Sequence, residues 1–158
     1  MVNQMRWRYG DPSSVVAAAD SASAIEIGDL LWLDGQLAKP AARYSPAGNS
    51  QQTRQGFAGK FLGVAMQQNP AGEGGPIRVA TTGVFEFDCV SSTFELGDWV
   101  GVAIDEQSGR PLSQKVVKVT TAAEAIGRVA KRAPQATEKV LVDICSTVMK
   151  GGVAGTTA

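Results

Sequence analysis

The chain has 158 residues, its 15 lysines and arginines balance 15 aspartates and glutamates, and it contains no histidine. This length suits one packed domain, or two small lobes that share a core. Balanced charge gives no field that would attract nucleic acid or an anionic membrane, so neither is expected as a partner. The lack of histidine excludes Ser-His-Asp and Cys-His catalysis and ordinary zinc-enzyme sites.

The composition predicts an all-β protein. Only 19% of the residues are charged, while 18 are glycine and 7 are proline, a balance that favours short strands and many turns. The N-terminus has no apolar segment of signal-peptide length, and no window approaches the roughly 20 apolar residues of a membrane helix. We therefore expect synthesis and retention in the cytoplasm, with Cys89 and Cys145 as small buried hydrophobic residues rather than a disulfide.

The first ten residues carry an aromatic and basic cluster, Arg6 to Tyr9, that lies outside any apolar pattern. One interpretation is a frayed terminus. The other is an extended arm that docks on a partner, because Trp, Tyr and Arg are the side chains that anchor interfaces. We assign residues 1–24 to this arm and its lead-in, in which the Ala-rich stretch 15–23 is open between helix and strand.

Two stretches share one pattern, IEIGDLLWL at residues 25–33 and FELGDWVGVAI at residues 94–104. Gly28-Asp29 and Gly97-Asp98 predict turns, because glycine supplies backbone freedom and aspartate bonds to its own loop. A strand should follow each turn. The sequence thus predicts a duplicated β unit.

Further similarities extend the duplication along the chain. Residues 61–65 match residues 125–130, and residues 83–89 match residues 140–145. We therefore predict a single β domain at 25–148, built from related halves at 25–90 and 94–148 and followed by a flexible tail at 149–158. The expected architecture is a small β barrel or sandwich, SH3-like or β-tulip-like.

Two segments inside the predicted domain have less regular patterns. Residues 41–59 are polar, and a loop of this length is usually functional or mobile; it is either a solvated excursion or a contact with a neighbouring subunit, with at most one helical turn at 50–57. Residues 77–90 alternate as one long strand, bent at Gly83.

No stretch of the sequence predicts catalysis. The carboxylates between Glu86 and Asp98 suggest an acid pair, but Glu86 and Asp88 alternate with apolar residues and should face solvent, whereas paired acids need a cleft. Asp98 and Asp105 lack the spacing of a calcium loop. Residues 69–76, NPAGEGGP, lack the lysine and the following helix of a phosphate cradle. We expect no catalytic residue, metal or cofactor, and no enzyme.

The order of elements resembles a known family. A Gly-Asp turn with an apolar strand, then FLGVA at 61–65, then GVFEFD at 83–88 is similar to the capsid decoration, or cement, proteins of tailed bacteriophages, of the DUF2190-like family. The similarity spans about residues 25–145. It implies a non-enzymatic virion protein, made in the host cytoplasm, that binds the outside of an assembled capsid and stabilises the shell, often as a homodimer or homotrimer.

The partners expected from this resemblance are the major capsid protein and further copies of the chain. Residues 1–10 should be removable with loss of capsid binding and little change in the melting transition. Alternatives are another virion β module of the tail, baseplate or head fibre, or a carbohydrate-binding module. The predicted partner contacts are aromatic, basic or apolar residues of the arm and the long loop: Met5, Arg6, Trp7, Arg8, Tyr9, Arg43, Tyr44, Arg54 and Phe57.

Overall fold

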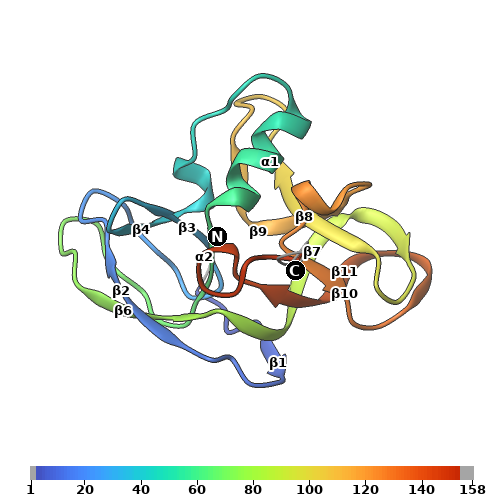
Figure 1. Cartoon of the computed structure of the whole chain (residues 1–158), viewed down its shortest axis with the longest axis horizontal. Helices are drawn as coiled ribbons and strands as arrows, with labels where there is room; N and C mark the ends of the chain where they lie inside the picture. Colours follow the sequence, from blue (N-terminus) through green and yellow to red (C-terminus); the bar gives the residue numbers. More distant parts are fainter. Residues whose placement is uncertain (1–2, 154–158) are drawn as a thin grey trace.

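Two closed five-stranded β barrels lie side by side in the computed structural model, which describes residues 3–153 (Figure 1). The predicted all-β fold with two related units is confirmed. The first barrel contains β2 (Val15–Ala19), β3 (Leu30–Asp34), β4 (Leu37–Pro40), β5 (Phe61–Ala65) and β6 (Pro76–Ala80). The second contains β7 (Thr82–Phe94), β8 (Trp99–Ile104), β9 (Pro111–Lys118), β10 (Gly127–Val129) and β11 (Ala133–Cys145).

The remaining elements connect or cover the barrels. Strand β1 (Trp7–Tyr9) pairs with β7 outside the second barrel. Helix α1 (Ser50–Gly59) lies on the opposite side of the molecule from β1, at the top of Figure 1. The short helices are η1 (Ala41–Arg43), η2 (Ala122–Glu124) and α2 (Thr147–Lys150), so α2 overlaps the start of the predicted tail, of which residues 154–158 lie outside the described part.

The barrels share one topology. Strand order is β2-β4-β3-β5-β6 in the first and β7-β9-β8-β10-β11 in the second. Each barrel closes through a short parallel pairing between its first and third strands, β2 with β4 and β7 with β9. Because every strand in one barrel has its counterpart in the other, the repeated units are 15–80 and 82–145, each beginning one strand before its Gly-Asp turn.

The Gly-Asp turns are built alike. Gly28 and Gly97 have φ angles of 97° and 87°, the left-handed region that favours glycine. The carboxylates of Asp29 and Asp98 each accept a hydrogen bond, 2.9 Å long, from the backbone N–H of the residue three positions earlier. Each glycine N–H also donates, at 2.9 Å, to a strand on the same barrel. The turns therefore fix the start of β3 and β8 in the same way.

Two sequence expectations are wrong: which residues of the two halves match, and how far the strand at 77–90 extends. Val142 pairs with β10 as Val79 pairs with β5, so residues 140–145 correspond to residues 77–82 and not to 83–89. The single strand expected at 77–90 is two strands from different barrels, which separate at Thr81. Alternating apolar residues continue through the junction because both strands bury one face, which is why the pattern did not reveal the break.

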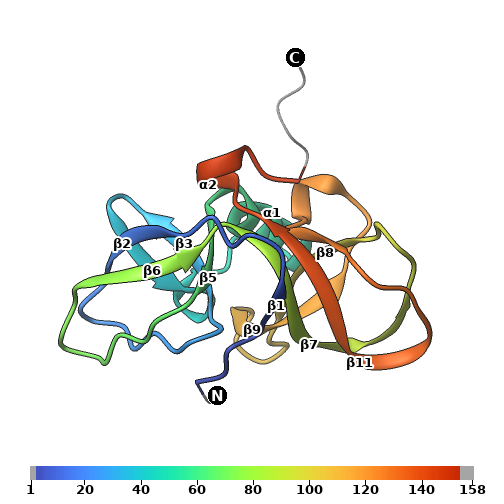
Figure 2. The ribbon, with the colours of Figure 1, turned by 90° about the horizontal axis from the view of Figure 1, so that it is seen from below.

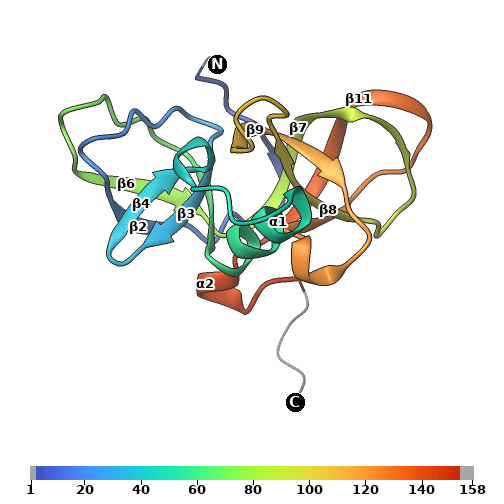
Figure 3. The ribbon, with the colours of Figure 1, turned by 90° about the horizontal axis from the view of Figure 1, so that it is seen from above.

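The polar segment at 41–59, expected to be a loop with at most one helical turn, contains the ten-residue helix α1. Asn49 and Gln52 form a reciprocal capping box, at 2.9 and 3.0 Å. Thr53 and Phe57, one turn apart, face the core. Phe57 is fully buried in an apolar cluster shared by both barrels, and Figure 3 shows α1 lying across their junction. A second apolar cluster fills the first barrel.

The matched turns predict unequal effects for one substitution. At Gly97 a Cβ atom would meet open space, so Gly97→Ala should cost only the left-handed backbone strain, about 1–2 kcal/mol. At Gly28 the Cβ atom would lie 2.6 Å from the Gln4 carbonyl oxygen. Gly28→Ala should therefore cost at least about 1 kcal/mol more, measured by urea denaturation. Equal losses would contradict the packing of the N-terminal segment on this turn.

Candidate functional site

The N-terminal segment, residues 3–10, runs between the two barrels and contacts both (Figure 2). Its Gln4 N–H donates to the Ile27 carbonyl of the first barrel at 3.0 Å. Two residues later, the Arg6 carbonyl accepts from the Glu86 N–H of β7 at 2.9 Å, and β1 continues the antiparallel pairing. The segment is therefore part of the folded structure rather than a detached extension.

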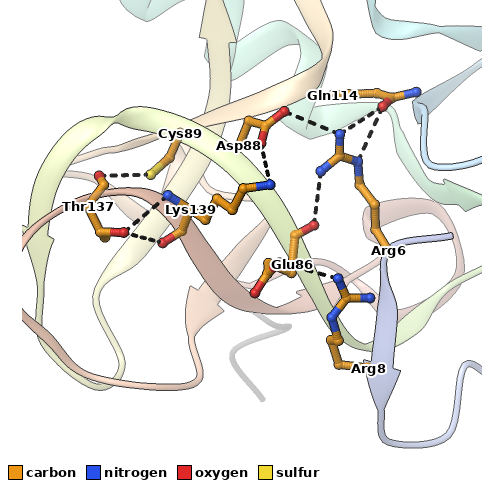
Figure 4. A network of polar contacts seen from close by, with 8 residues as sticks. All are labelled: Arg6, Arg8, Glu86, Asp88, Cys89, Gln114, Thr137 and Lys139. Carbon is orange, nitrogen blue, oxygen red and sulfur yellow. Dashed lines mark hydrogen bonds and ion pairs between the residues drawn. The ribbon is translucent and has the colours of Figure 1, made fainter. Parts of the chain in front are cut away.

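The Arg6 guanidinium is buried at the barrel junction, with 3% of the residue exposed. It donates to Gln114 Oε1 at 2.9 Å, to the Glu86 carbonyl at 3.2 Å and to Asp88 Oδ2 at 3.3 Å (Figure 4). A buried cation is tolerated only when its donors are paired in this way. The network anchors the N-terminal segment to β7 and β9 of the second barrel.

Gln114 extends the network to the first barrel. Its side-chain Nε2 donates to Asp29 Oδ1 at 2.9 Å, and both residues are buried. Burial raises the pKa of the Asp29 carboxyl, while hydrogen bonds from the Glu26 N–H and from Gln114 act in the opposite direction. Arg6, Gln114 and Asp29 thus form one buried polar chain that links the N-terminal segment, the second barrel and the first turn.

The burial of Arg6 overturns one expectation. Removal of residues 1–10 would leave Gln114 Oε1 and the Glu86 carbonyl without their arginine donor, so the melting temperature should fall. Sequence reasoning also missed Gln114. The sequence carried one sign of its burial: Gln114 lies two residues before Val116 in an alternating strand, so both side chains point to the same, buried face.

The exposed residues of the N-terminal segment include Met5, Trp7, Arg8 and Tyr9, and we call these four the N-terminal strip. Met5, Trp7 and Tyr9 are 45%, 38% and 52% exposed. The Trp7 Nε1–H donates to the Gly10 carbonyl at 2.8 Å, and Arg8 forms an ion pair with Glu86 at 3.2 Å. Three large apolar side chains and a cation thus lie close together in sequence, on β1 and just before it.

Of the candidate residues in the long loop, Arg54 and Phe57 belong to α1, which lies on the opposite side of the molecule from β1 in Figure 1. Phe57 is buried, and the Tyr44 ring packs edge-on against Trp32 and Phe57, with centroid distances of 5.0 and 5.9 Å. Arg54 pairs at 2.9 Å with the buried carboxylate of Glu124. Arg43 is exposed and donates to the Ala22 carbonyl. All four side chains therefore make contacts within the fold, and Arg43 is the one that is exposed.

A surface hollow of about 520 Å³ lies where β7, β9 and β11 meet and is lined by both acidic and basic side chains. Cys89 at its base is buried, and burial, with the nearby Asp88 charge, raises the pKa of its thiol to about 11. The thiol is therefore protonated near neutral pH and is a poor nucleophile. Cys89 and Cys145 are both free.

The described residues contain no group of three or more potential ligands from His, Cys, Asp and Glu placed to hold a metal ion. None of the helices in this part of the chain has the length and apolar character needed to cross a membrane.

Comparison with known proteins defines the class. Residues 45–144 match the model of the phage cement protein family, and the chain belongs to this family. It is a structural protein of the bacteriophage virion that binds the capsid. The N-terminal base of the head fibre protein gp8.5 of bacteriophage phi29 is a similar solved structure, with 15% identity and a TM-score of 0.45, covering 83% of this chain and 93% of that chain. No curated protein matches the chain.

The Asp29 carboxylate offers a test of the buried chain. One carboxylate oxygen accepts from the Gln114 amide and the other from the Glu26 N–H. In Asp29→Asn, the amide NH₂ replaces one of these oxygens and faces a donor, so one hydrogen bond is lost. We expect a loss of about 1–3 kcal/mol in the free energy of unfolding at pH 7. Asp98→Asn is the matched control, because Asp98 is partly exposed and its amide oxygen can still face the turn N–H. Equal losses in urea denaturation would show that the link to Gln114 contributes nothing.

Proposed function

We propose that this cement protein binds the outer surface of the assembled shell, contacts the major capsid protein through the N-terminal strip, and acts as a homodimer or homotrimer. Membership of the phage cement protein family carries the proposal. Many weak contacts on a repeating lattice multiply through avidity, so a cement protein needs a presented surface rather than a deep pocket. The strip supplies such a surface.

The composition of the strip supports its role as a contact. Tryptophan, tyrosine and arginine are the residues most enriched at the energetic centres of interfaces. Here Trp7, Arg8 and Tyr9 are consecutive, and Met5 adds a flexible apolar side chain. Exposed apolar side chains grouped in this way are typical of a surface that is covered by a partner.

The attachment of the strip also supports the proposal. Arg6 lies in the middle of the strip sequence, and its side chain is held by both Gln114 and Asp88. This anchor fixes the backbone on either side, so little conformational entropy is lost when the neighbouring side chains bind. Among the four candidates of the long loop, Arg43 is the exposed residue, and we assign it to contact with a neighbouring copy.

The strip predicts a selective loss of capsid binding. The double variant Met5→Ala/Tyr9→Ala should bind shells stripped of cement protein at least about tenfold more weakly, because it removes two exposed anchors and no buried contact. Occupancy after co-sedimentation with shells measures binding, and thermal melting should stay near that of the parent. Leu96→Ala is the control, since Leu96 is 71% exposed in a turn of the second barrel.

Unchanged occupancy of the double variant, or an equal loss for Leu96→Ala, would contradict the assignment of the strip. The oligomer is tested separately by light scattering coupled to size-exclusion chromatography. A monomer at the concentrations that saturate shells would contradict the homodimer or homotrimer.

A further inference from the structure

The two barrels differ at one strand edge. In the second barrel, two segments pair along one edge of β7. Strand β9 pairs with it at Asp88 and Cys89, and the N-terminal segment covers the part of the edge before these residues. In the first barrel, β4 pairs with β2 at Ala18 and Ala19. Within the described chain, no strand pairs with β2 on that side before Ala18.

The pairing registers establish which residues correspond. Val15 lies opposite Val79 on β6, and Phe85 lies opposite Val142 on β11. Val79 and Val142 are equivalent, because each pairs with the strand that accepts the glycine N–H of its own turn. Val16 of β2 is therefore the counterpart of Glu86 of β7. In Glu86 both backbone groups are used, the N–H by the Arg6 carbonyl and the carbonyl by the Arg6 guanidinium.

The backbone of Val16 points toward the open side. Val16 lies opposite Arg78, whose N–H donates to Gln67 Oε1 and whose carbonyl accepts from Met66, both on the side of β5. In an antiparallel pair, opposed residues either bond to each other or both point away. The N–H and carbonyl of Val16 thus face away from β6, at an edge where Val16 is 61% exposed.

The side chains at the two edges differ in charge. On β7 the outward residues are Glu86 and Asp88, which pair with Arg8 and Arg6 of the seated segment at 3.2 and 3.3 Å (Figure 4). The same positions on β2 are Val16 and Ala18, with Leu37 paired beside Ala18 and 37% exposed. An arginine-bearing strand suits the acidic β7 edge. The β2 edge suits a strand that is uncharged and apolar at these positions.

The location of this edge agrees with that of the N-terminal strip. Strands β1 and β2 both lie along the lower side of Figure 1, and both are in front in Figure 2, which views that side. A partner surface that contacts the N-terminal strip therefore also lies on the side of the molecule where β2 is found.

We propose that the open edge of β2, around Val16, accepts an extended segment of the capsid protein as an added antiparallel strand, with uncharged apolar side chains facing Val16 and Ala18. The segment takes the position that residues 6–8 occupy on β7. Main-chain hydrogen bonds supply affinity in such strand addition, and alternate side chains supply selectivity. This inference rests on the proposed capsid binding and adds the site and the chemistry of the bound segment.

Hydrogen exchange of the Val16 amide tests the inference directly. The full chain is bound to stripped shells, exchanged, quenched and analysed by fragmentation mass spectrometry. We expect fast exchange in the free protein and at least about tenfold slower exchange on shells, because an added strand bonds this N–H. The Glu86 amide, already bonded to Arg6, is the internal control and should be protected in both states.

A variant tests the same bond. Val16→Pro removes the outward N–H and leaves the bonds of Val15 and Ala17 to β6 in place. We expect shell binding about tenfold weaker than that of Val16→Thr, which keeps the N–H and the branched side chain. Melting of both variants is measured alongside. If Val16→Pro does not fold, the exchange experiment on the parent protein decides.

The outcomes are distinct. Binding to shells with an unprotected Val16 amide overturns the strand addition and leaves the proposed function standing. Concentration-dependent protection without shells identifies a second copy as the occupant and also overturns it. A chain that does not bind shells at all removes both the proposed function and this inference.

Discussion

The buried guanidinium of Arg6 connects the N-terminal segment to the second barrel directly and to the first barrel through Gln114. Its donors go to β7 and β9, and Gln114 passes the connection to Asp29 in the first barrel. A charge taken out of water is costly unless each donor is paired, so the N-terminal segment cannot leave this position without leaving buried polar groups unpaired. The segment thereby fixes the junction, and the junction in turn fixes how the exposed strip is presented.

Duplication explains the architecture, and divergence explains its asymmetry. Both barrels use the same turn, the same strand order and the same parallel closure. They differ where partners meet: the β7 edge bears Glu86 and Asp88 and is covered from within the chain, whereas the β2 edge bears Val16 and Ala18 and is open. An open strand edge is a liability unless it is short, charged or covered. The β2 edge carries no charge at Val16 or Ala18 to protect it, which is consistent with a covering partner.

Helix α1 is an insertion in the first unit that serves the second. It lies between β4 and β5, yet Arg54 pairs with Glu124 beside β8, and Phe57 enters the apolar cluster common to both barrels. The ion pair, unlike a surface pair, has a buried carboxylate that depends on its one cation and on the Thr121 hydroxyl. Helix α1 and strand β1, which follows Arg6 directly, lie on opposite sides of the molecule in Figure 1. The cross-connections through α1 and through Arg6 together hold the barrels in one arrangement.

The sequence by itself determined the fold class, the duplication and the family resemblance, because these depend on local rules. A Gly-Asp pair at φ near 90° makes its turn from its own hydrogen bonds, and alternating apolar residues make strands wherever they stand. Only the tertiary structure decided that Arg6 is buried while Trp7 and Tyr9 are exposed, that residues 77–90 divide between two barrels, and that Val16 is the open counterpart of Glu86. These properties depend on which strands lie side by side, and that is decided by contacts between residues far apart in the sequence.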